Sequence, residues 1–163
     1  MAWWIADTVL YLTANLFMAV GEVTMRLVAL AFGFALLGGC ASTHAIEPQL
    51  VSADMDFTSA ETVEVSLSNF RFSPTSLEFR SGKPYILKIS NDAEGGHDFT
   101  APEFFAAARV EAEDANRIAN GQLELAGGET TSIRLVPGTG EYKLVCTHFG
   151  HSTLGMVGKI IVR

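Results

Sequence analysis

The chain has 163 residues, of which 48% are hydrophobic, and a formal net charge of -7. This length accommodates one domain and not comfortably two. Phosphate binding requires clustered Lys and Arg, so 11 basic residues against 18 acidic ones argue against a nucleic-acid partner.

Residues 1–39 are predicted to be a leader. The apolar run 27–39 has the length of a signal-peptide core, is too short for a comfortable membrane span and follows the basic Arg26. It ends in the residues 37–40 (LGGC), which resemble the lipobox of bacterial lipoproteins. This resemblance implies that Cys40 becomes the lipidated first residue of an exported chain that is anchored to the membrane.

Residues 1–24 leave two alternatives open. Met25 and Arg26 would by themselves open a compact signal peptide, so Met25 is a candidate for the true start. Alternatively, residues 2–20 form a transmembrane helix, which the polar side chains within that stretch disfavour.

Residues 40–61 are predicted to be the lipidated cysteine and a flexible tether. The segment is rich in Ala, Ser, Thr and acidic residues and has no clear hydrophobic period. It would link the lipid anchor to the domain that follows.

Residues 62–163 predict an all-β domain. Residues 62–68 alternate strictly, with Val63, Val65 and Leu67 on one face, as a half-buried strand requires. Turn signals separate further short apolar alternations at 70–72, 77–79, 85–89, 123–125, 133–135, 142–146 and 157–162. Seven or eight such strands indicate an antiparallel sandwich or barrel.

One interval departs from this strand pattern. Residues 101–120 are rich in Ala and Glu, and Pro102 occupies the place of a first helical residue. We therefore predict one or two short helices here, with Phe104, Phe105 and Ile118 packed on the core.

The segment 146–156 places a thiol, an imidazole and a thioether in one loop between two predicted strands. Cys146, His151 and Met156 supply them, and His97, which follows a Gly-Gly pair, supplies a second imidazole. One Cys and two His with a weak axial Met are the ligands of blue-copper sites. Because thiolate suits Cu(II), thioether suits Cu(I) and imidazole suits both, we predict one copper ion that cycles between these states.

Residues 62–163 resemble the cupredoxin family, in the style of azurin, auracyanin and plastocyanin. The resemblance is carried by the opening 69–74 (NFRFSP), the spacing from Asn91 to His97 and the closing Cys-x4-His-x4-Met. It implies a Greek-key β-sandwich in which Cys146 ends the penultimate strand. It also implies that His151 lies near the surface and that Met156 begins the last strand.

Two residues near the predicted ligands depart from the family pattern. His148 forms a Cys-x-His spacing that does not match the family, so His151 is preferred as ligand. His148 remains an alternative ligand, a group next to the ligands, a partner contact or a transient copper relay. Asp98 stands where many members carry Asn; as a carboxylate it can accept hydrogen bonds from Thr147 but cannot donate. Its negative charge should lower the reduction potential.

The expected function is one-electron transfer at the exported face of a membrane, with a redox protein such as a cytochrome or a respiratory complex as partner. The family places a weak docking patch around the second His, here Gly150, Leu154 and Gly155. A monomer is expected, and the choice between inner and outer membrane stays open. The alternative function is copper storage, delivery or resistance.

No enzymatic activity and no disulfide are predicted. Four histidines in the whole chain cannot build the trinuclear cluster of a copper oxidase, and a two-copper site would need a second Cys in the same loop. The two cysteines each have a separate predicted use, Cys40 in lipidation and Cys146 in copper binding.

Overall fold

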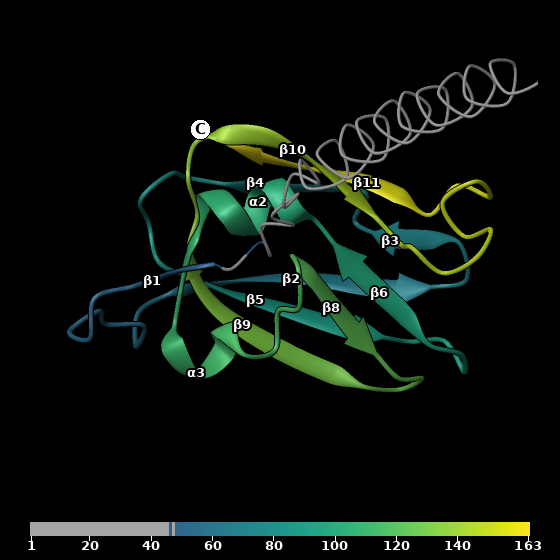
Figure 1. Ribbon diagram of the computed structural model, residues 1–163, viewed down its shortest axis with the longest axis horizontal. Helices are drawn as coiled ribbons and strands as arrows, with labels where there is room; N and C mark the ends of the chain where they lie inside the picture. Colours follow the sequence, from purple (N-terminus) through teal and green to yellow (C-terminus); the bar gives the residue numbers. More distant parts are fainter. Residues whose placement is uncertain (1–45, 47) are drawn as a thin grey trace, which may run out of the picture. The chain divides into compact units, whose positions relative to one another are not determined.

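The computed structural model describes residue 46 and residues 48–163 (Figure 1). The predicted leader and the predicted lipidation at Cys40 lie outside the described residues. The prediction that Cys40 and Cys146 form no disulfide therefore stays a prediction. The described part folds as two β-sheets with two short helices. Neither helix is long and apolar enough to cross a membrane.

Eleven strands make up the two sheets of the described part. The six-stranded sheet has the order β1 (Gln49–Leu50), β7 (Arg109–Val110), β9 (Thr130–Val136), β5 (Tyr85–Asn91), β2 (Glu61–Ser68) and β3 (Arg71–Ser73). The five-stranded sheet has the order β4 (Ser76–Phe79), β11 (Val157–Val162), β10 (Gly140–Val145), β6 (His97–Thr100) and β8 (Gln122–Leu125).

The predicted β-sandwich is confirmed, and all eight predicted strands are present. The sheets are mixed rather than antiparallel, because β2 pairs with β5 and β4 pairs with β11 in parallel register. Three strands were not predicted: β1, β6 and β7. All four residues of β6 are buried, so this strand shows no alternation of apolar and polar residues.

The core lies between the two sheets. Inward-facing side chains of both sheets are fully buried, among them Leu67, Phe72, Leu87, Ile89, Phe99, Leu125, Ile133 and Leu144. Burying a side chain of this size contributes about 1.5–3 kcal/mol relative to leaving it in water. The core therefore gives the strands that carry the candidate ligands a fixed relative position.

The two predicted short helices are confirmed between His97 and the later strands. Helix α2 spans Pro102–Ala107 with the proline at its first turn, and α3 spans Ala112–Ala115. Phe104, Phe105 and Ile118 are buried in the core, as predicted. Figure 1 shows both helices at the opposite end of the sandwich from the loop between β10 and β11.

The segment predicted as a tether is in part bound to the domain. β1 pairs with β7 in parallel, and the N–H of Val51 donates to the carbonyl of Val110 at 3.0 Å. The flexible tether up to residue 61 is thus corrected: the chain is attached to the sheet from Gln49. β7 pairs with β9 on one side and offers its free backbone groups to β1 on the other, which makes β1 the edge strand of the sheet. A two-residue pairing is too short to appear as a hydrophobic period.

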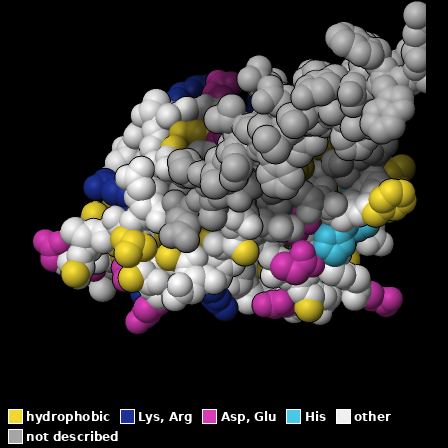
Figure 2. Space-filling view, in the orientation of Figure 1, with side chains coloured by type: hydrophobic (Ala, Val, Ile, Leu, Met, Phe, Trp, Pro, Cys, Tyr) yellow, Lys and Arg dark blue, Asp and Glu magenta, His cyan; other side chains and the backbone are white. Residues whose placement is uncertain are grey.

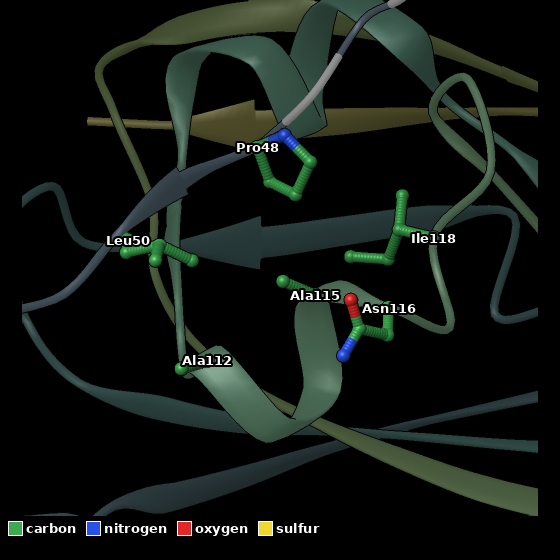
Figure 3. A pocket seen from close by; sticks show the side chains of 6 residues that line it. All are labelled: Pro48, Leu50, Ala112, Ala115, Asn116 and Ile118. Atoms are coloured by element: carbon green, nitrogen blue, oxygen red, sulfur yellow. The ribbon is translucent and has the colours of Figure 1, made fainter.

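A groove of about 400 Å³ lies where β1 passes the α3 region (Figure 3). It is lined by Pro48, Leu50, Ala112, Ala115, Asn116 and Ile118. None of these side chains is ionisable, so the groove offers no groups for acid–base or metal chemistry.

Candidate metal centre

Strand pairing brings the four predicted ligands to one end of the five-stranded sheet. His97 is the first residue of β6, and Cys146 directly follows β10, which pairs with β6. Met156 directly precedes β11, and the N–H of Cys146 donates to the carbonyl of Met156 at 3.2 Å. The loop 146–156 therefore closes on itself at its base, and His151 lies within it.

The ligand atoms of three of these residues converge. The Sγ of Cys146 lies 3.9 Å from the Nδ1 of His97 and 3.4 Å from the Nδ1 of His151. A metal ion that bonds sulfur at about 2.3 Å and nitrogen at about 2.0 Å would hold such atoms about 3.7 Å apart in a trigonal plane. The donor set and its spacing therefore fit one first-row metal ion. Met156 is fully buried next to this loop.

Burial sets the protonation of these groups. Desolvation raises the pKa of the Cys146 thiol, while the backbone N–H groups of Asp98 and His148 that hydrogen-bond to the sulfur oppose this shift. Burial, followed by the nearby His151 and His148, lowers the pKa of His97. Without metal the site thus holds a protonated thiol and a neutral His97, and a bound cation would replace the thiol proton.

Asp98 connects the two segments that carry the ligands. Its carboxylate, which is completely buried, accepts from the backbone N–H of Thr147 at 2.8 Å and from the Thr147 hydroxyl at 2.8 Å. The hydroxyl of Thr100 donates to the same carboxylate at 2.6 Å. The predicted acceptance from Thr147 is confirmed, and Asp98 ties β6 to the start of the loop.

The family model of copper binding proteins, plastocyanin/azurin family, matches residues 59–163. The chain belongs to this family. Its cofactor is one copper ion, in agreement with the Cys and His donors at the end of the sandwich.

Solved structures that are similar to the chain include two auracyanins and a multicopper oxidase. Auracyanin B is 22% identical with a TM-score of 0.51, covering 72% of this chain and 96% of its own. Reduced auracyanin from Roseiflexus castenholzii is 16% identical with a TM-score of 0.49, covering 64% and 98%. The multicopper oxidase McoA from Aquifex aeolicus is 15% identical with a TM-score of 0.54, covering 71% of this chain but only 31% of its own. No curated protein sequence matches the chain.

In this member of the plastocyanin/azurin family, His148 lies outside the converging Cys–His group. Its Nε2 is 2.9 Å from the Oε1 of Glu124 and 4.0 Å from the Oδ2 of Asp98. Glu124 had no motif to mark it in the sequence. It comes to this place because Asp98 in β6 pairs with Glu124 in β8, which only the strand register shows.

Large apolar side chains are exposed in and next to the loop that carries His151. Phe149, Leu154 and Val157 are exposed in or next to the loop, and Phe149 is entirely so. Phe70, also exposed, packs edge-on against the His151 ring with 5.2 Å between ring centres. We call these four side chains the apolar patch. Of them, only Leu154 was predicted. Figure 2 shows histidine, acidic and hydrophobic surface side by side at the end of the molecule that carries the loop.

Proposed function

We propose that the protein is a one-electron carrier whose copper ion is held by His97, Cys146 and His151, with Met156 as the axial ligand. The observation that carries this proposal is the buried Cys146 sulfur, which lies 3.9 and 3.4 Å from two imidazole Nδ1 atoms. A thiolate, two imidazoles and a thioether serve both Cu(I) and Cu(II), so bound copper supplies a reversible one-electron couple.

The protein's own part in electron transfer is to keep the ligands fixed and dry. His97, Cys146 and Met156 have at most 1% of their surface exposed, so the ligands cannot rearrange freely when the charge of the site changes. The Asp98–Thr147 hydrogen bonds hold the loop against β6. This rigidity keeps the rearrangement of the copper ligands small each time an electron is transferred.

His151 is the proposed ligand that reaches the surface, where it is half-buried. The apolar patch includes Phe70, which packs on the His151 ring, and exposed residues in and next to the same loop, so a partner can dock there without displacing strongly bound water. This favours a weak contact with a redox protein such as a cytochrome or a respiratory complex. The predicted lipid on Cys40 would keep a monomeric carrier at the membrane face of the cell envelope, beside that partner.

The carrier role is favoured over an enzymatic one. One Cys–His group among the described residues and four histidines in the whole chain provide a single copper site with a thiolate ligand and too few imidazoles for a trinuclear cluster. A single copper with a complete set of protein ligands leaves no open position for a substrate.

The visible spectrum tests the ligand assignment. Loading the purified chain with Cu(II) should give an intense thiolate-to-copper absorption that Cys146→Ser abolishes. His151→Ala should abolish or strongly shift the band, whereas the matched control His148→Ala should keep it. A colourless, weakly bound copper, or loss of the band in His148→Ala alone, would overturn this assignment.

The second candidate function is copper delivery or storage. The His148–Glu124 pair at the rim of the site favours it, because a half-buried imidazole next to an exposed carboxylate can bind a cation in transit. Mixing the copper-loaded protein with a reduced cytochrome separates the two functions. A carrier takes the electron and keeps its copper, while a delivery protein loses copper to an acceptor.

A further inference from the structure

The pair of His148 and Glu124 is a second cluster of metal-binding side chains, distinct from the Cys–His group. Ligand atoms of Asp98, Glu124 and His148 all lie within 4.8 Å of one another. Gly96 leaves room for the cluster, because a Cβ there would lie 3.2 Å from the Glu124 Oε1 and 3.3 Å from the His148 Cε1. The backbone thus accommodates both side chains at one place.

The spacing of the two accessible atoms suits copper. The His148 Nε2 and the Glu124 Oε1 are 2.9 Å apart, which is the separation of two neighbouring ligands at about 2.0 Å from one ion and about 90° to each other. In the structure the two atoms are hydrogen-bonded, and without the bridging hydrogen they are an N,O ligand pair of the kind that tetragonal Cu(II) accepts, as does Ni(II). The fully buried carboxylate of Asp98 lies 4.0 Å from the His148 Nε2 and adds negative charge next to the His148–Glu124 pair. Its own oxygens stay hydrogen-bonded to Thr147 and Thr100.

The cluster also lies on the accessible side of the buried site. Among the four proposed ligands only His151 has appreciable surface, so an ion must pass its ring to reach the sulfur. The His148 ring stacks on His151 with 5.4 Å between centres, and it lies 6.2 Å from the His97 ring. An ion held by His148 is therefore adjacent to the buried site.

We propose that His148 and Glu124 form a copper uptake site, where Cu(II) binds before it moves past His151 to Cys146. This rests on the proposed copper function. On binding, Cu(II) displaces the hydrogen that the His148 Nε2 donates to the Glu124 Oε1, and this proton passes to water. The transfer is then a ligand exchange: bonds to the His148 nitrogen and the Glu124 oxygen break, bonds to the buried ligands form, copper stays Cu(II), and the thiol proton passes to water. Two protein ligands hold copper weakly enough to release it.

The rate of copper uptake tests this proposal. Apo protein is mixed with dilute Cu(II), and the growth of the visible absorption is followed by stopped flow. His148→Phe, which keeps a ring on His151, and Glu124→Gln should each slow uptake by about fivefold or more while leaving the final spectrum unchanged. The matched control is Glu94→Gln, which removes one negative charge from an exposed position on the neighbouring loop and should keep the wild-type rate. Equal rates in all four proteins would overturn the uptake site.

Direct binding is the second measurement. One further equivalent of Cu(II) added to copper-loaded protein should give a second EPR signal with coupling to a single imidazole nitrogen. His148→Phe should lose this signal, and Glu94→Gln should keep it. No second signal, or one that persists in His148→Phe, would overturn the proposal. Absence of the visible band in the wild type would instead count against the carrier function, and EPR titration of that protein would still decide whether His148 binds copper.

Discussion

At the scale of single residues, Asp98 places a buried carboxylate 3.7 Å from the Cys146 sulfur. We expect Asp98→Asn to raise the reduction potential, because loss of a negative charge removes a preference for Cu(II). One charge about 5 Å from the metal at an effective dielectric constant of about 20 corresponds to about 3 kcal/mol. For one electron this is on the order of 100 mV.

A redox titration of the visible band measures this shift. Glu94→Gln is the control, since it removes an exposed charge that solvent and salt screen. Asn keeps one side-chain oxygen to accept from Thr147, so the loop should stay attached to β6. An unchanged potential in Asp98→Asn would show that this carboxylate does not tune the site.

The residue types of the site could be predicted because their order along the chain is informative. Cys146, His151 and Met156 share one loop. The family pattern places the remaining ligand, His97, earlier in the sequence, before this Cys-x4-His-x4-Met loop. Glu124 could not be predicted, because it reaches His148 through the pairing of β6 with β8, which no local motif encodes. The apolar alternation predicts Phe70 in a strand, but Phe70 lies in a turn at φ 62, packed on His151.

At the scale of elements, the structure differs most from the prediction at β1, which pairs with the sheet where a flexible tether was expected. Its contact with the sheet includes the Val51 N–H bond to the Val110 carbonyl at 3.0 Å. We expect Val51→Pro to remove this donor and to lower the free energy of unfolding by about 1–2 kcal/mol.

Urea unfolding of the variant measures this loss, and hydrogen exchange should locate it in β1 and β7. Ser52→Pro is the matched control, since it places the same ring one residue later, at an exposed position. The visible band of the copper-loaded variant should not change, because the loop 146–156 lies at the other end of the sandwich (Figure 1). Equal stability of Val51→Pro and wild type would mean that β1 is not bound in solution.

Strands could be predicted from the sequence where one face is buried and the other is exposed to solvent, because apolar and polar residues then alternate. β2 and β5 show this alternation plainly, whereas β6 is buried on both faces and β1 and β7 are only two residues long. The parallel pairing of β2 with β5 joins segments that are distant in sequence, so local patterns could not distinguish it from an antiparallel arrangement.

At the scale of the whole molecule, bound copper would join β6 to the loop between β10 and β11. His97 and Cys146 are 49 residues apart in sequence, and the proposed ligands fix both segments to one ion. A ligand that binds only the folded state stabilises it by about 4 kcal/mol at a thousand times its dissociation constant. For a domain of this size that corresponds to a rise of roughly 15 °C or more in Tm.

Copper binding should also depend on pH with a definite sign. Because burial raises the pKa of the Cys146 thiol, this group keeps its proton at neutral pH, and each copper bound must release it. Affinity should therefore rise about tenfold per pH unit below the thiol pKa and level off above it. Calorimetry in buffers of different ionisation enthalpy counts the protons, and Cys146→Ser should lose both the proton release and the Tm increase. A Tm that copper raises equally in Cys146→Ser would show that the stabilising ion is bound without the thiolate.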